Sequence, residues 1–353
     1  MIIPILNQLS YRSIPRNKDL KLTITNSCDF ASRVLVVDTN GECFICACEA
    51  WLPISVGNIL DFALLKDIWS TPAAVALQQD IAQKKFTHCA VDRCGILHND
   101  QRAIEYTGRK DVDDCYYISI NIDDSCNLQC PSCRPDLKME TSGEGFDRKS
   151  KMVNHLVQLL EKFDQPAHVI MTGNGDPLAS SIMRPLLHNY SPPKNQTIRL
   201  FTNGLLLEKQ LADNPIVNNI SQYFISIDAG SEEVYERVRL GGKHKQLLKN
   251  FDFLCELIRS TGASVLLKFV LQRDNWADME PFVLLCKRYQ FEGVINRLED
   301  WGTWPNFSEH DVIGNIHHVE HVPAVAELRR VYKLYCNQMQ FNSSLKDLAN
   351  ELN

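Results

Sequence analysis

The pattern of apolar and polar residues changes near residue 115. Beyond that point, short apolar runs rich in β-branched residues alternate with stretches in which apolar residues recur every three or four positions. The first pattern is typical of buried parallel strands, and the second of helices that pack on a sheet. Six strands are predicted, near residues 116–122, 167–172, 196–202, 222–228, 264–271 and 293–299.

Strands that alternate with helices predict an α/β fold. We expect a partial (β/α)6 barrel over residues 111–305 and a C-terminal helical extension over residues 306–353. In parallel α/β folds the ligand site lies at the C-terminal ends of the strands. Residues that carry chemistry are therefore expected in the loops that follow each strand.

Residues 1–110 are expected to form a separate, small and cysteine-rich domain. The strand-like run "SRVLVVDTNGECFIC" contains a hairpin turn at residues 39–41. One helix is predicted to begin at Pro72, with Ser70 or Thr71 as its cap, and its apolar pattern continues to Phe86.

Composition and charge narrow the class of protein. The 353 residues are 44% hydrophobic, which is enough to bury a sizeable core. The net charge of -6 and the lack of long runs of like charge argue against nucleic acid as a partner. No apolar run approaches the roughly 20 residues that span a membrane, and the start, "MIIPILNQLSYRSIP", does not read as a signal peptide. We therefore expect a cytoplasmic protein with no membrane partner.

The chain contains 13 cysteines, an odd number. Cytosolic thiols stay reduced, so metal ligands and buried thiols are expected rather than disulfides. Cys126, Cys130 and Cys133 follow the first predicted barrel strand with the spacing C-x3-C-x2-C. Three thiolates can hold three irons of a [4Fe–4S] cluster and leave the fourth iron open for a substrate or cofactor. A zinc site completed by a distant ligand, or three reduced thiols, would fit the same spacing.

This spacing after the first strand of a partial barrel resembles the radical S-adenosylmethionine (SAM) superfamily. The resemblance implies that the open iron chelates SAM and that an electron from the cluster cleaves SAM to a 5′-deoxyadenosyl radical, which abstracts hydrogen from a substrate. An electron donor such as flavodoxin or ferredoxin is then expected. Ser132 stands where many members carry an aromatic residue near adenine, so contacts to adenine are expected elsewhere.

The segment "MTGNGDP" at residues 171–177 resembles the Gly-Gly-Glu segment by which the family holds the SAM amino group. The resemblance assigns this role to the backbone of Gly173, Asn174 and Gly175 and to the acid Asp176, which is one methylene shorter than the family's Glu. Glycines also let the main chain approach a ligand closely. The alternative is an ordinary glycine-rich turn between a strand and a helix.

Two later segments resemble further SAM-binding loops of the family. They are "FTNGLLL", which contains Asn203, and "ISIDAGSEEVYERVRLGG", in which the resemblance implies that Ser226 and Asp228 face the ribose. The resemblance implies that Arg239 meets the SAM carboxylate, for which the planar guanidinium is suited. The alternative is that Arg239 is a surface charge on a helix, paired with Glu236 or a neighbour.

Four earlier cysteines, Cys28, Cys46, Cys89 and Cys94, form a complete set of thiolate ligands. Their segment resembles the SPASM or twitch domain of radical SAM enzymes, which implies an auxiliary [4Fe–4S] cluster. This domain normally follows the barrel, and here it precedes it. A zinc knuckle would use the same ligands.

Three further cysteines could replace one of the four, complete a second auxiliary cluster or donate hydrogen to a substrate radical, although most are expected to be plain thiols. They are Cys43, Cys48 and Cys115.

The resemblance implies an enzyme that modifies a peptide or protein side chain by oxidation, cross-linking or epimerisation. A dehydrogenase or epimerase of a sugar or aminoglycoside is the alternative within the family, and a zinc-stabilised binding protein without catalysis is the alternative outside it. Candidates for contact with a peptide or small-molecule substrate follow the sixth strand, and they are Arg297, Asp300, Trp301 and Trp304.

Overall fold

The computed structural model describes residues 28–46, 51–91, 94, 97, 115–300 and 302–350, apart from the side chain of Ser343. Among these residues, no helix has both the length and the apolar character that a membrane span requires.

The described residues form one sheet of nine strands in the order β2-β1-β3-β4-β5-β6-β7-β8-β9. The strands are β1 (Val34–Val37), β2 (Cys43–Phe44), β3 (Tyr116–Ile120), β4 (Ala167–Met171), β5 (Gln196–Thr202), β6 (Ile220–Ser226), β7 (Ser264–Leu271), β8 (Glu292–Arg297) and β9 (Gln340–Phe341). Every neighbouring pair is parallel except β1 and β2. Strands β3 to β8 are the six predicted strands, so the predicted partial barrel is confirmed.

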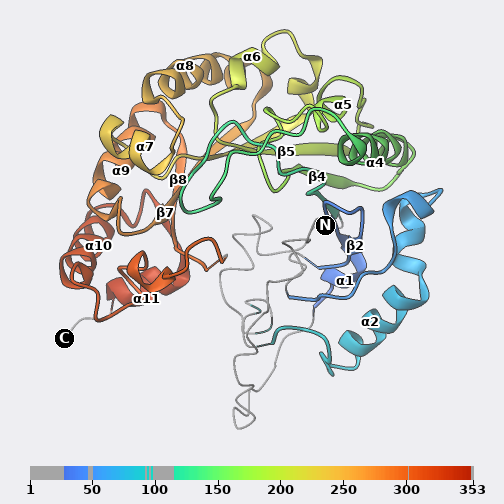
Figure 1. Ribbon diagram of the computed structural model, residues 1–353, viewed down its shortest axis with the longest axis horizontal. Coiled ribbons are helices and arrows are strands. Elements are labelled where there is room, and N and C mark those ends of the chain that lie inside the picture. The colour runs from blue at the N-terminus through green and yellow to red at the C-terminus, as the bar shows by residue number, and fades with distance from the viewer. Residues whose placement is uncertain are drawn as a thin grey trace.

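Helices α4, α8, α9 and α10 lie on the outer side of this curved sheet (Figure 1). The helices of the described residues are α1 (Phe30–Arg33), α2 (Pro72–Ala82), α4 (Glu144–Glu161), α5 (Arg184–His188), α6 (Leu207–Leu211), α7 (Glu232–Val238), α8 (His244–Thr261), α9 (Met279–Tyr289), α10 (His321–Tyr335) and α11 (Ser343–Asn350). Helices α4, α8 and α9 turn their buried apolar residues toward the sheet. This packing buries the main core between sheet and helices.

The other face of the sheet carries aromatic and cationic side chains. Phe201 and Phe224 stack with ring centroids 4.2 Å apart. The guanidinium of Arg199 lies 5.5 Å from the ring centroid of Tyr117, and the ammonium of Lys268 lies 5.5 Å from that of Phe201. We call this the inner face, because the sheet curves around it (Figure 1).

The cysteine-rich residues share the barrel sheet. β1 pairs in parallel with β3, with Val34 opposite Tyr117 and Val37 opposite Ile120. The predicted hairpin joins β1 to β2, and Gly41 makes its turn possible with φ of 84°. The barrel sheet is therefore wider than the six predicted strands, and the domain limits at residues 110 and 305 stay predictions.

Two predicted element ends are wrong for the same backbone reason. Helix α2 begins at Pro72 with the side chain of Thr71 as its cap, as predicted, but it ends at Ala82. It cannot continue to Phe86, since Lys84 and Phe86 have positive φ angles of 55° and 51°. Strand β6 ends at Ser226, before Asp228, which has φ of 54°.

Candidate active site

The cysteine loop, residues 123–140, follows β3 at the C-terminal edge of the sheet. Cys126 and Cys130 are buried, and Cys133 is exposed. The backbone N–H of Cys126 donates to Lys138 O at 2.8 Å, and that of Cys133 donates to Cys130 O at 2.9 Å. These bonds fold the loop back on itself and bring its three thiols to one end of the barrel, as the sequence predicts.

Each of the three thiols has one side-chain N–H donor near its sulfur. The pairs are Asn203 Nδ2 with Cys126 at 3.8 Å, Arg239 Nη1 with Cys130 at 3.6 Å and Arg134 Nη2 with Cys133 at 3.7 Å. Burial raises the pKa of Cys126 to about 11 and also raises that of Cys130, which the Arg239 charge opposes. Because a metal ligand must be the thiolate, these donors favour the form that binds iron.

Arg239 belongs to a buried ion pair. Its Nη2 lies 2.8 Å from Asp228 Oδ2, and the side chains of the two residues are 11% and 3% exposed. Asp228 Oδ1 accepts from the N–H of Val270 at 2.8 Å. Pairing with Glu236 on the surface, the alternative for Arg239, is therefore wrong.

One donor of Arg239 is left over. Its Nε is buried and has no hydrogen-bond partner among the described residues. A buried donor without an acceptor is costly, so this N–H is available for an anion such as a carboxylate. Contacts of Arg239 with the SAM carboxylate, and of Ser226 and Asp228 with the ribose, stay predictions.

The glycine segment after β4 lies against the cysteine loop. A Cβ at Gly175 would lie 2.1 Å from Ser125 O, and one at Gly173, where φ is 59°, would lie 2.8 Å from Asp123 O. The N–H of Asn174 donates to Asp123 O at 3.0 Å. The glycines thus permit a close approach of this main chain to the cysteine loop, and its approach to a ligand stays a prediction.

Asp176 ties this segment to the end of β5. Its buried carboxylate accepts from Thr202 Oγ1 at 2.8 Å, Asn203 N at 2.7 Å and Leu178 N at 2.9 Å. Burial raises its pKa, and these hydrogen bonds oppose the shift. Its contact with the SAM amino group stays a prediction, while the structure gives the carboxylate a clear task in holding two loops together.

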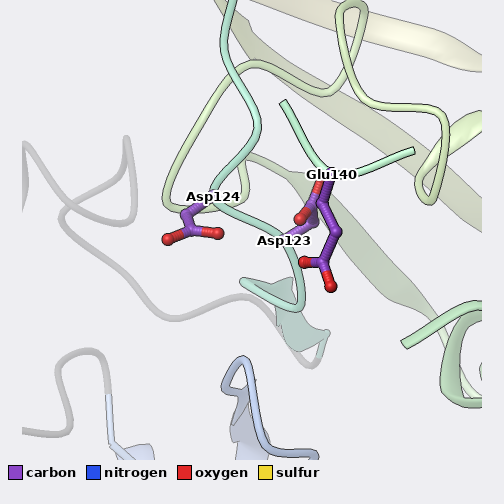
Figure 2. A group of neighbouring side chains, drawn as sticks. All are labelled: Asp123, Asp124 and Glu140. Carbon is purple, nitrogen blue, oxygen red and sulfur yellow. The ribbon is translucent and has the colours of Figure 1, made fainter. Parts of the chain in front are cut away.

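The sequence analysis did not identify the acidic cluster beside the cysteine loop, which is Asp123, Asp124 and Glu140 (Figure 2). Their carboxylate oxygens lie within 4.8 Å of one another, as ligands of one cation would. Lys149 Nζ supplies that cation, at 3.4 Å from Asp123, 3.5 Å from Asp124 and 2.7 Å from Glu140. Burial alone would lower the pKa of Lys149, but the carboxylates outweigh it and the pKa is raised. The cluster is therefore an ion-pair network rather than a metal site.

Three of the four predicted auxiliary cysteines influence one another electrostatically. Burial, with smaller contributions from the thiolates of Cys94 and Cys89, raises the pKa of Cys28 to about 12. Burial and Cys94 raise the pKa of Cys89 to about 11. Cys46 follows β2 and is half-buried. The structure thus brings Cys28, Cys89 and Cys94 near one another, and the full ligand set stays a prediction.

The other cysteines of this part of the chain differ in their surroundings. Cys43 is fully buried and its thiol donates to Gly41 O at 3.8 Å. Cys115 is half-buried, and Cys48 lies outside the described residues.

The segment after β8 reaches the cysteine loop. Thr303 Oγ1 lies 3.5 Å from Cys133 O. Trp304 stacks on His310, with ring centroids 3.8 Å apart. Trp301 lies outside the described residues.

Two charged candidates of this segment have internal partners. Arg297 Nη2 lies 3.2 Å from Asp311 Oδ2. The Asp300 carboxylate accepts from Gly302 N at 2.9 Å. Contact of these side chains with a substrate stays a prediction.

Comparison with known protein families agrees with this geometry. Residues 120–286 match the family described as the radical SAM superfamily, and residues 28–95 match SPASM, an iron–sulfur cluster-binding domain. The chain therefore contains a radical SAM domain with a SPASM domain N-terminal to it, which is the domain content of a radical SAM enzyme. The cofactors of these domains are a SAM-binding [4Fe–4S] cluster, SAM and an auxiliary iron–sulfur cluster, so the predicted domain order and cofactors are confirmed.

Curated relatives are distant. GTP 3′,8-cyclase of Limosilactobacillus fermentum is 26% identical over 52% of this chain and 57% of its own length. Mycofactocin maturase MftC of Mycobacterium tuberculosis is 24% identical over 50% of this chain and 43% of its own length. The chain thus spans about half the length of the curated relatives it matches. Among solved structures, Streptococcus suis SuiB matches with a TM-score of 0.44 and 14% identity over 79% of this chain and 64% of its own.

The spacing of the three thiols is relevant to whether this site holds a cluster or a single ion. One zinc ion, with Zn–S bonds of about 2.3 Å, would draw its thiolates to roughly 4 Å from one another. In the described part of the chain, no three cysteine thiols lie within 4.8 Å of one another. A four-iron cluster holds each thiolate on a separate iron and so spaces them more widely.

Proposed function

We propose that this enzyme cleaves SAM reductively at the cysteine loop and abstracts hydrogen from a carbon of its substrate. One observation carries the proposal. Three cysteine thiols at the C-terminal edge of the sheet each have an N–H donor, and the Asp228–Arg239 ion pair leaves one buried donor of Arg239 beside them.

Each protein group has a separate task in this proposal. When bound, the cluster and SAM supply the one-electron chemistry that yields a 5′-deoxyadenosyl radical. Cys126, Cys130 and Cys133 hold the cluster, and their donors stabilise the thiolate form. Arg239 Nε offers a hydrogen bond to the SAM carboxylate. The glycine segment and Asp176 fix the loop on which the SAM amino group is expected to lie.

We further propose that the substrate is a peptide or protein side chain. The edge strands β2 and β9 of the described sheet do not pair with each other, so the barrel is open along one side. An open barrel can admit a chain that a closed one, filled by its own side chains, would exclude. The names of the curated relatives, a cyclase, a maturase and a heme synthase, describe different reactions and do not select among substrates.

The auxiliary cluster is proposed to act beside the substrate. Cys28 packs against the cluster of Phe30, Val34, Tyr117 and Ile170, and Tyr117 belongs to the inner face. The pairing of β1 with β3 fixes this part of the chain against the barrel. An auxiliary cluster held by Cys28 would therefore adjoin the inner face, where it could bind the substrate or accept an electron.

The test is anaerobic reconstitution followed by iron analysis and an assay for 5′-deoxyadenosine. Two four-iron clusters predict about eight irons per chain. Replacement of Cys126, Cys130 and Cys133 by Ala should remove about half of the iron and abolish SAM cleavage. Replacement of Cys28 and Cys46 by Ala should spare some SAM cleavage but stop substrate turnover.

The exposed Cys336 provides a matched control, and Cys336→Ala should change neither quantity. A colourless protein that contains only zinc and does not cleave SAM after reconstitution would refute the proposal. Turnover that survives the loss of Cys28 and Cys46 would refute the auxiliary role.

A further inference from the structure

Arg134, the residue after the third cysteine, has contacts beyond the thiol of Cys133. Its side chain is buried, with the residue 7% exposed. Nη1 donates to Asp124 O at 2.6 Å, and Nη2 donates to Asn174 O at 2.6 Å and to Cys133 Sγ at 3.7 Å. One guanidinium therefore joins the cysteine loop, the glycine segment after β4 and a predicted cluster ligand.

The charge of Arg134 distinguishes it from the other two donors. Asn203 is neutral, and Arg239 is neutralised by Asp228 at 2.8 Å. The hydrogen bonds of Arg134 go to two carbonyls and a thiol. The nearby carboxylate of Asp124 is already engaged by two lysine ammonium groups. Among the described residues, Arg134 has no carboxylate at ion-pair distance. A buried cation in such a place is stabilised by an anion, and the thiolate of Cys133 is the anion within reach.

We propose that Arg134 is a positioning residue with two separable effects, one on the electron affinity of the cluster and one on the loop that receives SAM. The proposal rests on the proposed function, because it takes Cys133 as a ligand of the SAM-binding cluster. An added electron makes the cluster more negative, so a cationic N–H donor at a ligand sulfur stabilises the reduced form. Arg134 thereby raises the reduction potential of the cluster.

The second effect depends on shape rather than charge. The planar guanidinium fork donates to Asp124 O and Asn174 O at once, which the single ammonium of lysine does not reproduce. These two bonds clamp the glycine segment against the cysteine loop. The Asn174 carbonyl keeps a second lone pair for another donor. Arg134 therefore fixes the segment from which a SAM amino group would be held.

Two substitutions separate the effects. Arg134→Lys keeps the charge and loses the fork, while Arg134→Met loses both. Arg259→Met is the matched control, since Arg259 is exposed at the end of α8, away from the cysteine loop.

The clamp is tested first on the apoprotein, by hydrogen exchange of the amides of residues 173–176. Both Arg134 variants should exchange about tenfold faster in this segment, because a hydrogen bond to a charged group is lost. The Arg259 variant should match the wild type. Unchanged exchange in both Arg134 variants would overturn the clamp, and this result does not depend on whether the protein binds a cluster.

The charge effect is tested on reconstituted protein by potentiometric titration monitored by electron paramagnetic resonance (EPR). Arg134→Met should shift the potential of the SAM-binding cluster to more negative values, whereas Arg134→Lys should keep most of the wild-type potential. Both variants should bind SAM about tenfold more weakly. Equal potentials in wild type and Arg134→Met would overturn the electrostatic effect. Failure of the wild type to assemble a cluster would overturn the proposed function and the electrostatic effect with it, but not the clamp.

Discussion

Replacement of Lys149 by Met tests whether the acidic cluster is held together by its one central cation. Lys149 lies on α4, and its ammonium contacts Glu140 at 2.7 Å, Asp123 at 3.4 Å and Asp124 at 3.5 Å. The side chains of Lys149 and Asp123 are 9% and 0% exposed. Met keeps the apolar stem and removes the charge, so the variant leaves a fully buried carboxylate without a cation.

The expected loss in the free energy of unfolding follows from how deeply each ion pair is buried. Loss of one partner from a buried ion pair costs about 3–5 kcal/mol, while partly exposed pairs contribute less than about 1 kcal/mol. Asp124 and Glu140 are 28% and 30% exposed, so the Asp123 contact dominates. The hydrogen bond from Ser180 Oγ to Asp123 Oδ2, at 2.6 Å, remains and limits the loss. We expect the free energy of unfolding to fall by about 3 kcal/mol, or the Tm by about 4 °C.

Thermal unfolding of the apoprotein measures this effect, with Lys151→Met as the control. Lys151 lies on the same helix and is exposed, so its loss should change the Tm little. The variant also leaves three carboxylates arranged for a divalent cation, and Ca²⁺ prefers oxygen ligands. Millimolar Ca²⁺ should therefore restore part of the Tm of Lys149→Met and leave the wild type unchanged. Equal Tm values for the Lys149→Met and Lys151→Met variants would refute the electrostatic account of this cluster.

Three other predictions concern the cysteine loop, the buried ion pair and the thiols. Gly175→Ala places a Cβ 2.1 Å from Ser125 O and should strongly lower the amount of iron that the reconstituted protein retains. In the control Gly145→Ala, the new Cβ meets the movable side chain of Glu140, so less iron should be lost. Equal iron contents in the two variants would contradict this prediction. Asp228→Asn removes the carboxylate that pairs with buried Arg239, and it should lower the free energy of unfolding, measured with denaturant, by about 3 kcal/mol. Asp213→Asn, at an exposed position, should change this free energy little. Burial raises the pKa of Cys286 from 9.0 to about 12, so the buried neutral thiol stabilises the fold fully below pH 9, and this stabilisation is lost as the pH rises toward 12. In the native apoprotein at pH 8, a thiol reagent should label exposed Cys336 and spare Cys286 until the chain unfolds.

Strand periodicity was sufficient to place the barrel, because each strand of a covered parallel sheet is a short apolar run. β3 to β8 fall where the pattern predicts them. The periodicity could not show that β1 pairs with β3, because nothing in the sequence of Val34–Val37 indicates which distant strand it pairs with. The positive φ of Lys84 and Phe86, which ends α2 early, likewise depends on surroundings rather than on residue type.

The spacing of the cysteines was sufficient to find the candidate site, but its supporting contacts were not visible in the sequence. Arg134 and Lys149 act on residues brought near by loop packing, Asn174 in one case and Asp123 in the other. A cation next to the third cysteine is the one local signal that could have indicated Arg134. Nothing near Lys149 in the sequence distinguishes it from Lys151, its exposed neighbour on α4.

The central claim is that the cluster on the cysteine loop keeps one iron open for SAM. It is tested most directly by EPR of the reduced protein in the Cys28→Ala and Cys46→Ala double variant, where the signal comes from the cluster of Cys126, Cys130 and Cys133. Addition of SAM should change this spectrum, because the amino and carboxylate groups of SAM would bind the open iron. A spectrum that stays the same at saturating SAM would contradict the claim.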